Sequence, residues 1–277
     1  MSYLSAVILG LVQGVAEFLP ISSSGHLAIL QKFFRMADVE HDHMFFDVLL
    51  HLGTLIAVFA AYRKDIADLI REFLRMVHLQ RIPRHQKADY PKRRMILMLI
   101  LATLPLFLVL PIKDKVEGLY TNTLFIAGAL VVTGLLLFLS DRFARGGKNE
   151  KDIRISDALF VGVGQAIAVV PGLSRSGTSI AAGMYRGFER SFAVKFSFLL
   201  SIPAVLGANI LSLADAIHSG IDNSLLPVYL VGVLVAMVSG YASIILLRYI
   251  AGKGRFGGFA YYCWGAAIVT LVFSLIS

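Results

Sequence analysis

Six apolar stretches, each long enough to cross a bilayer as a helix, dominate this sequence; they occupy 44–63, 95–112, 123–140, 192–214, 225–247 and 258–276. A transmembrane helix needs about 20 mostly apolar residues to span the hydrocarbon core. The composition agrees, since 57% of the chain is hydrophobic and only 16% is charged, whereas soluble domains carry about a quarter charged residues. We therefore predict an all-α integral membrane protein.

The net charge of +8 does not indicate a nucleic-acid partner, because the Lys and Arg residues lie in short segments between the apolar stretches. Two such segments are 63–94 and 141–154, and a third begins at Arg248. The positive-inside rule places segments of this kind in the cytoplasm. Residues 215–226 contain no Lys or Arg, so we expect them outside, together with both termini.

The linker 64–94 contains a second kind of helix signal. Its middle, residues 65–79, spaces apolar side chains at helical intervals among charged ones. This pattern is typical of an amphipathic helix that lies on the cytoplasmic membrane surface. A solvated linker without such a helix is the alternative.

Two further apolar segments, 1–36 and 157–187, are interrupted near their middles by turn-forming residues. The first is broken from Pro20 to Gly25, and the second is broken from Pro171 to Gly177. Because the sides of the flanking crossings are fixed, each segment has to enter and leave the membrane on one face, as a re-entrant helix–loop–helix. Irregular backbone at that depth is tolerated only where protein or a water-filled cavity covers it.

The two interrupted segments are related to each other. At an offset of 152 residues, "QGVAEFLPISSSGH" from Gln13 resembles "QAIAVVPGLSRSGT" from Gln165. We predict two repeats, 1–150 and 151–277, each made of one re-entrant hairpin and three crossings. Since three is odd, the second repeat is inverted relative to the first, and the hairpin tips meet near the midplane, where such folds bind substrates. Chance similarity between two short turns is the alternative.

Both turns carry groups that bind phosphate. Each turn leads into a second half-helix, whose free N–H groups and positive dipole end attract anions. Arg175 adds a planar cation suited to phosphate oxygens, while simple helix capping by the serines is the competing explanation. The predicted substrate-binding residues are Gln13, Ser22, Ser24, Gly25, Ser174, Ser176, Gly177 and Thr178.

Glu17, His26 and Arg175 are ionisable groups at predicted membrane depth, where such groups are costly and mark functional sites. Glu17 is the candidate general base or metal ligand, and His26 is the candidate proton carrier. Ser23 is the candidate nucleophile, or else an oxygen donor to the phosphate. A Glu17–Arg175 pair that merely neutralises charge is the alternative.

Another polar position follows the first interrupted segment. Asp47 and His51 are four residues apart, so a helix places them on one face. They either extend the polar site or line a hydrated cavity, and the sequence leaves both interpretations open.

The tracts "QGVAEFLPISSSGH" and "PGLSRSGTSIAAG" resemble the two signature motifs of the undecaprenyl-diphosphate phosphatases of the bacitracin-resistance type. The tract "FFDVLLHLGTLIAVFAAYRKDI" also resembles this family, and the likeness covers essentially the whole chain. It implies a bacterial plasma-membrane enzyme whose outward-facing site hydrolyses undecaprenyl diphosphate to undecaprenyl phosphate and inorganic phosphate. The product is the recycled carrier lipid of cell-wall synthesis, which links the family to bacitracin resistance. The family's serine, histidine and arginine positions fall on Ser23, His26 and Arg175.

The resemblance also implies a divalent cation, Mg²⁺ or Ca²⁺. The family's first motif has Glu or Gln, three residues and then Glu, and here Gln13 and Glu17 take those places. Gln13 cannot supply an anionic ligand, so a cation would be held by Glu17 together with the diphosphate itself.

A transporter is the alternative function. Inverted repeats with broken helices also describe secondary transporters, such as a flippase of polyprenyl phosphate or a carrier of another anion. A transporter needs anion ligands but no nucleophile or proton relay, so the combination of Glu17, Ser23 and His26 favours an enzyme. The expected partners are a polyprenyl diphosphate and membrane lipids, and the sequence does not indicate an oligomeric state.

Overall fold

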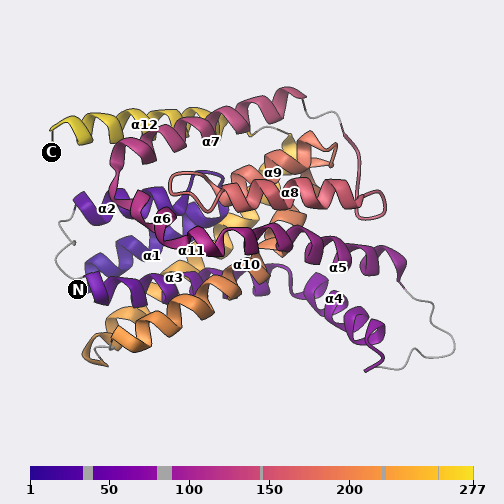
Figure 1. Ribbon diagram of the computed structural model, residues 1–277, viewed down its shortest axis with the longest axis horizontal. Helices are drawn as coiled ribbons and strands as arrows, with labels where there is room; N and C mark the ends of the chain where they lie inside the picture. Colours follow the sequence, from indigo (N-terminus) through magenta and orange to yellow (C-terminus); the bar gives the residue numbers. More distant parts are fainter. Residues whose placement is uncertain (34–39, 80–88, 144–145, 220–222, 255, 277) are drawn as a thin grey trace.

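The computed structural model describes residues 1–33, 40–79, 89–143, 146–219, 223–254 and 256–276. Within these ranges the regular structure is helical, joined by turns and loops, and contains no strand, so the predicted all-α class is confirmed. Its long helices follow the long axis of the molecule (Figure 1). Parts of five predicted segments lie outside the described residues: 34–36 of the first hairpin, 80–88 of the linker, 144–145 of the second basic segment, 220–222 of the predicted external segment and 255 of the third basic segment.

Five of the described helical segments are long and apolar enough to cross a membrane. One of them, Tyr90–Ile112, combines α5 (Tyr90–Thr103) with the short 3-10 helices η2 (Leu104–Leu108) and η3 (Leu110–Ile112). The other four are α7 (Thr123–Phe143), α10 (Arg190–Ser219), α11 (Leu226–Lys253) and α12 (Gly257–Ile276). Short connecting helices are α6 (Lys113–Glu117), η4 (Gly118–Thr121) and η5 (Asn223–Leu225).

A sixth crossing depends on a bent pair of helices. α3 (Glu40–Ala61) and α4 (Arg63–Met76) meet the membrane-span criteria only together, and the chain turns by 84° between them. α4 coincides with the predicted amphipathic helix, and its acidic side chains pair with the start of α5. Asp68 lies 2.9 Å from Lys92, and Glu72 lies 2.7 Å from Arg93. The described residues therefore provide five helical segments long and apolar enough to cross a membrane, or six if the bent pair forms one span.

The surface of the molecule is that of a membrane protein. Large apolar side chains point outward from several long helices, for example Ile210 at 67% exposed, Val238 at 64% and Val269 at 67%. So much exposed apolar area would be insoluble in water, whereas lipid solvates it while the helices satisfy their own backbone groups.

The start of α5 differs from the prediction, which begins the crossing at residue 95. The helix starts at Tyr90, because the Asp89 side chain accepts a hydrogen bond from the Lys92 N–H (3.2 Å) and Pro91 fits the first turn. Pro105 and Pro111 then lie in η2 and η3, where the α-helix tightens. Proline removes a backbone donor and so disturbs the regular ladder at these points.

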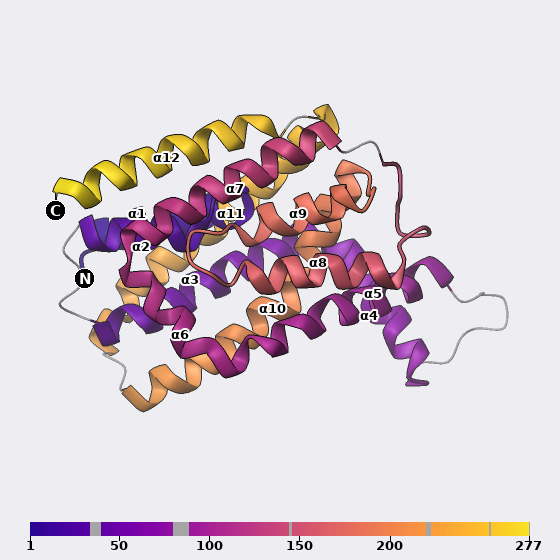
Figure 2. The same cartoon turned by 45° about the horizontal axis from the view of Figure 1, so that its top comes forward.

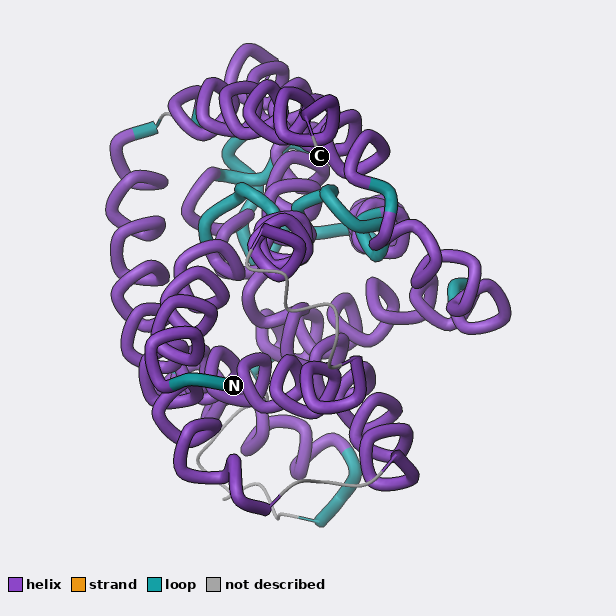
Figure 3. The backbone as a smooth tube through the Cα atoms, turned by 90° about the vertical axis from the view of Figure 1, so that its left-hand side faces the viewer, coloured by secondary structure: helices purple, strands orange, loops and turns teal. Residues whose placement is uncertain are grey.

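Two shorter helix pairs occupy the interrupted segments. The first pair is α1 (Tyr3–Phe18) with α2 (Ser23–Phe33), and the second is α8 (Ile155–Ile167) with α9 (Arg175–Tyr185). The offset of 152 residues carries the start of α1 onto the start of α8, and both ends of α2 onto both ends of α9. The pairs extend inward from opposite ends of the long axis and turn near its middle (Figures 1 and 2). Viewed along that axis, loop segments lie among the helices (Figure 3).

Small residues hold the first pair against α11. A Cβ added at Gly10 would lie 2.5 Å from the Gly232 carbonyl oxygen, and one added at Gly14 would lie 2.5 Å from the Ala236 carbonyl oxygen. Four-residue spacing of small side chains lets helix backbones approach closely in lipid. This contact fixes the position of α1, and with it the residues Gln13 and Glu17.

The predicted cytoplasmic segments meet at one end of the molecule. Lys195 at the start of α10 pairs with Asp65 (2.6 Å) in the first linker and with Glu150 (3.5 Å) in the second. The Arg94 guanidinium donates to the Ile153 carbonyl at 2.6 Å. The two linkers therefore share one end, as the charge pattern predicts, while the N-terminus and the end of α12 lie at the other end (Figure 1).

Candidate functional site

A buried hydrogen-bond network is centred on Glu17, at the end of α1. Ser23, the first residue of α2, donates its hydroxyl to Glu17 Oε2 at 2.6 Å, and Gln13 Nε2 donates to the same oxygen at 3.1 Å. Glu17 is only 7% exposed. A short charge-assisted contact of this kind allows the carboxylate to accept the proton of the serine hydroxyl.

Arg175 joins this network from the second helix pair. Its guanidinium pairs with Glu17 Oε1, and its other terminal nitrogen lies 3.5 Å from the Ser201 carbonyl oxygen. The Arg175 side chain is 22% exposed, so the pair lies at an edge that a ligand could reach. The structure thus brings together Glu17, Ser23 and Arg175, which the sequence analysis placed in one site.

The two turns pack against each other through their glycines. A Cβ added at Gly25 would lie 3.1 Å from Gly172 of the second turn, and one added at Gly177 would lie 3.2 Å from Pro20 of the first. Ser176 also donates to the Leu19 carbonyl at 3.4 Å. Gly25 and Gly177 were predicted to admit a phosphate, and in the structure each admits the opposite turn.

The serines of the turns act first as helix caps. The Ser22 hydroxyl accepts from the Gly25 N–H (3.3 Å), and the Ser174 hydroxyl accepts from the Gly177 N–H (3.0 Å). Each capping hydroxyl also contacts the serine two residues later: Ser22 contacts Ser24 at 3.4 Å, and Ser174 contacts Ser176 at 3.2 Å. Capping, the competing explanation in the sequence analysis, therefore accounts for Ser22 and Ser174, and the two turns use the same pattern.

His26 lies on α2 but makes its contacts away from the Glu17 network. Its Nδ1 lies 2.7 Å from the Ser22 carbonyl oxygen, and its Nε2 lies 2.9 Å from the Tyr262 hydroxyl. The His26 and Tyr262 rings stack at 5.6 Å between centroids. Because a carbonyl oxygen only accepts, Nδ1 carries a proton, and Nε2 is the nitrogen left to exchange protons.

Two predicted substrate-binding residues have a buried polar atom without a hydrogen-bond partner among the described residues. The two atoms are Gln13 Oε1 and Thr178 Oγ1. Gln165, which the repeat aligns with Gln13, has neither amide atom partnered within that same part of the chain. Buried polar groups are normally hydrogen-bonded, so unpartnered ones mark positions where a ligand or water is expected.

The sequence analysis left open whether Asp47 and His51 extend the site, and it did not name Ser197 or Ser201. His51 Nε2 lies 3.8 Å from Glu17 Oε2, so His51 borders the network. Ser197 and Ser201 lie with Arg175 along a narrow crevice beside Glu17. A signal was present, because at an offset of 150 residues Asp47 aligns with Ser197 and His51 aligns with Ser201.

The residues at the site do not by themselves form a metal site. Within the described residues, no group of three His, Cys, Asp or Glu side chains could hold a metal ion. Both oxygens of Glu17 have protein partners, Arg175 on one side and Ser23 with Gln13 on the other. Gln13 offers one neutral oxygen, whereas Mg²⁺ and Ca²⁺ sites draw on several oxygen ligands, carboxylates above all.

Comparison with known proteins places the chain in a family. A family model described as bacitracin resistance protein BacA matches residues 6–269. Proteins named undecaprenyl-diphosphatase from Alkaliphilus metalliredigens and Methanobrevibacter smithii are 38% and 42% identical, covering 100% and 99% of both chains. Another of the same name, from Syntrophotalea carbinolica, is 42% identical over 95% of this chain and 96% of its own. The chain belongs to the bacitracin resistance protein BacA family.

Proposed function

We propose that this protein hydrolyses undecaprenyl diphosphate to undecaprenyl phosphate and inorganic phosphate, and so returns carrier lipid to cell-wall synthesis and supports bacitracin resistance. The observation that carries the proposal is the contact of Ser23 and Arg175 with one buried carboxylate, Glu17, where two helix turns meet. A nucleophile, a proton acceptor and a phosphate-binding cation are thereby within reach of one phosphorus atom. The names of relatives that match the whole chain support the same reaction.

The proposal includes a particular arrangement in the membrane. Both helix pairs are re-entrant hairpins that dip in from opposite faces, and their halves form inverted repeats. The opposite entry of the pairs in Figure 1 and the matching helix bounds support this arrangement. The basic linkers gather at one end of the molecule, so the positive-inside rule makes that end cytoplasmic. The first hairpin then opens to the exterior of a bacterial plasma membrane, and the site faces outward.

Substrate binding begins with an exchange of partners at Arg175. The diphosphate replaces Glu17 on the guanidinium, whose planar fork suits two phosphate oxygens. Thr178 and the N–H groups at the starts of α2 and α9 supply further donors. Charge that develops on the transferring phosphoryl group is stabilised in place, which is the main demand of phosphoryl transfer.

Ser23 then attacks the terminal phosphorus atom. Glu17 accepts the hydroxyl proton, a new P–O bond forms to Ser23, and the anhydride bond breaks to release the lipid monophosphate. Glu17 releases this proton to solvent before water attacks the phosphoserine. It then takes a proton from that water and returns it to the Ser23 oxygen, as the P–O bond to Ser23 breaks and inorganic phosphate leaves. In the variant mechanism, water attacks directly and Ser23 only binds the phosphate.

His26 serves the leaving group in this scheme. To reach a phosphate oxygen, its Nε2 has to exchange the Tyr262 hydroxyl for substrate. Nδ1 stays on the Ser22 carbonyl, so the ring keeps its orientation while Nε2 passes a proton.

A divalent cation, in this proposal, reaches the site only on the diphosphate, because the site itself does not fit one. We expect Mg²⁺ or Ca²⁺ added to substrate-free protein to leave its melting temperature unchanged, since only ligands bound by the folded state raise it. A rise of several degrees that Glu17→Gln abolishes would instead demonstrate an ion held by the protein. The measurement is a thermal melt in detergent, with and without EDTA.

The main test is phosphate release from farnesyl diphosphate by the purified protein in detergent. Ser23→Ala should lower the rate by about 10³-fold, because it removes both the nucleophile and the hydroxyl on Glu17. Ser140→Ala is the matched control, since Ser140 is a buried serine outside the site whose hydroxyl donates to the Leu137 carbonyl of its own helix; it should stay within a few-fold of wild type. Acid quenching with labelled substrate separates the two mechanisms, because only nucleophilic attack leaves label on Ser23.

Detergent also separates hydrolysis from transport. The arrangement of two opposed hairpins equally suits a carrier of lipid phosphate, but vectorial transport cannot occur in a micelle. If folded wild-type protein released no phosphate with or without added Mg²⁺, the hydrolase proposal would be abandoned. Uptake of polyprenyl phosphate by liposomes would then be measured.

A further inference from the structure

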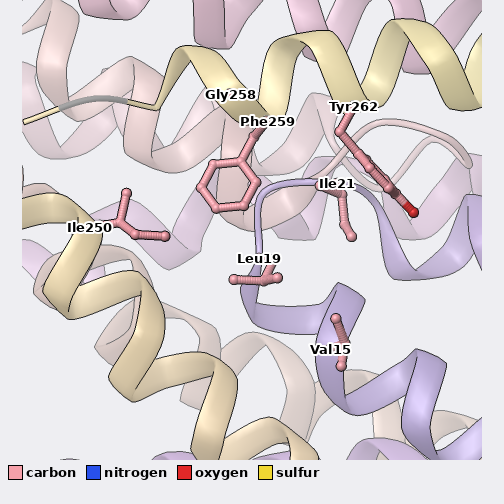
Figure 4. Close-up of a pocket in the computed structure, with 7 residues that line it drawn as sticks. All are labelled: Val15, Leu19, Ile21, Ile250, Gly258, Phe259 and Tyr262. Atoms are coloured by element: carbon pink, nitrogen blue, oxygen red, sulfur yellow. The ribbon is translucent and has the colours of Figure 1, made fainter.

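An apolar groove borders the first turn, and no residue of the Glu17 network lines it. Its volume is about 490 Å³, and Figure 4 shows residues from three parts of the chain around it. Leu19 and Ile21 come from the first turn, Ile250 comes from the end of α11, and Gly258 and Phe259 come from the start of α12. The groove is large enough for a substantial apolar ligand.

The wall between the groove and the site is a few residues of one turn. Leu19 follows Glu17 by two residues, and Ile21 precedes Ser23 by two. Leu19 and Ile21 line the groove, whereas Glu17 and Ser23 bond to each other in the network. A molecule that places its phosphates in the network therefore needs only to pass this turn to place its chain in the groove.

Tyr262 connects the two sides. Its ring lines the groove, and its hydroxyl bonds to His26 Nε2 at 2.9 Å. Tyrosine suits such a boundary, because its ring is apolar and its hydroxyl stays partnered. A residue that lines the groove thus contacts His26, the predicted catalytic residue that lies outside the Glu17 network.

We propose that this groove binds the isoprene units of the substrate nearest the diphosphate, and that Tyr262 is a specificity residue at its inner end. This inference rests on the proposed function, because it takes a polyprenyl diphosphate as the ligand. The occupant has to be an apolar chain attached to a phosphorylated head, because the groove is apolar and shares the first turn with the phosphate site. An acyl chain of a bulk membrane lipid has no such attachment.

Gly258 offers a substitution that fills the groove without disturbing the fold. A Cβ added at Gly258 would meet nothing within 4 Å, and the same is true of Gly265, farther along α12 and outside the groove. Leucine is a better helix former than glycine at both positions. Gly258→Leu and Gly265→Leu are therefore a matched pair that differ in whether the new side chain enters the groove.

The test compares two substrates of different chain length in detergent. For farnesyl diphosphate, with three isoprene units, Gly258→Leu should raise KM at least about tenfold, because even one methylene group in an apolar pocket is worth that much. For dimethylallyl diphosphate, KM should change less than twofold, because its single unit reaches Tyr262 but not Gly258, about one helix turn away along α12. Gly265→Leu should change neither KM. If Gly258→Leu changed KM equally for both substrates, or for neither, the proposal that the groove binds the isoprene chain would be refuted.

Photolabelling makes the result independent of catalysis. A farnesyl diphosphate analogue with a diazirine on its second isoprene unit should label residues at the start of α12 or in the first turn, and Gly258→Leu should reduce this labelling at least fivefold. Labelling elsewhere refutes the groove even if phosphate is released. Labelling at the start of α12 or in the first turn without phosphate release would refute the proposed hydrolysis but support the groove as the binding site of the isoprene chain. Equal competition by a long-chain alcohol without phosphate would make it a general lipid site and refute the assignment.

Discussion

Ser22 in the first turn and Ser174 in the second cap their helices in the same way, yet their backbones differ. Ser22 has φ +73°, in the left-handed region, while Ser174 has φ −75°. In the second turn the left-handed position is taken by a glycine, Gly172, with φ +88°. A non-glycine residue in this region stores strain, and such strain is concentrated at functional sites. The first turn therefore holds its strained residue directly beside Ser23.

The two hairpins also differ in how firmly they are held. The residues Ser176–Met184 of α9 are all buried, whereas much of α2 is partly exposed. At its base the second hairpin has a buried carboxylate, Asp157, paired with Lys148 (3.0 Å) and Arg186 (2.8 Å). The equivalent of Asp157 in the first hairpin is Ser5, whose N–H bonds to Ser2 at 3.1 Å. The second hairpin is thus the fixed support, and the first carries the reacting groups.

The largest effect of a substitution in the second hairpin is expected at Arg175, the charged residue that this hairpin contributes to the site. Arg175→Ala should lower kcat/KM for phosphate release by about 10²- to 10³-fold, the usual loss for a donor that stabilises developing charge. Arg175→Lys restores the charge without the planar fork and should recover only part of the rate. Full recovery with lysine would show that the second hairpin supplies charge alone.

A smaller effect is expected at the bases of the hairpins. Asp157→Asn removes the charge that Lys148 and Arg186 pair with, and should destabilise the fold by about 1 to 2 kcal/mol after allowance for its partly exposed partners. Ser5→Ala, the equivalent change in the first hairpin, should cost under about 0.5 kcal/mol. Melting temperatures in one detergent compare the two variants. Equal shifts would contradict the description of the second hairpin as the better-anchored one.

The smallest effect is expected at the capping serines, and there the two hairpins should respond differently to the same substitution. Ser174→Gly should cost about 1 kcal/mol of stability, because it loosens an ordinary backbone position and removes the cap. Ser22→Gly also removes a cap, but it relieves a left-handed φ, so its net cost should be about zero. Stability measured by thermal melts should rank Ser22→Gly above Ser174→Gly, and the reverse order would mean that the first turn is unstrained.

The sequence predicts the membrane-spanning helices and the centre of the site because both leave a direct pattern in the order of residues. Apolar length reveals the spans, and the 152-residue offset brings Ser23 and Arg175 into corresponding turns. The same offset reproduces the bounds of α2 and α9. These features can be read from the linear sequence without knowledge of how the helices pack.

Other contacts depend on how helices pack in lipid, where both faces of a helix are apolar and periodicity no longer marks the buried side. The Tyr262 partner of His26 is 236 residues away in sequence and has no counterpart in the repeat. The position of α1 follows from Gly10 and Gly14 against α11, a contact that the motif search did not use. The role of Gly25 and Gly177 in turn-to-turn packing likewise emerged only from the fold.

The meeting of the two turns has a consequence for biosynthesis. Glu17 and Arg175 are 158 residues apart, so a ribosome that adds about 5 to 20 residues per second makes Glu17 roughly 8 to 30 seconds before its partner. During that interval the first hairpin has a carboxylate without its arginine, and Gly25 has no second turn to pack against. A lone carboxylate is costly in hydrocarbon. In the proposed re-entrant arrangement, we therefore expect the first hairpin to remain in a wet environment, at the membrane surface or in the insertion machinery, until the second half of the chain arrives.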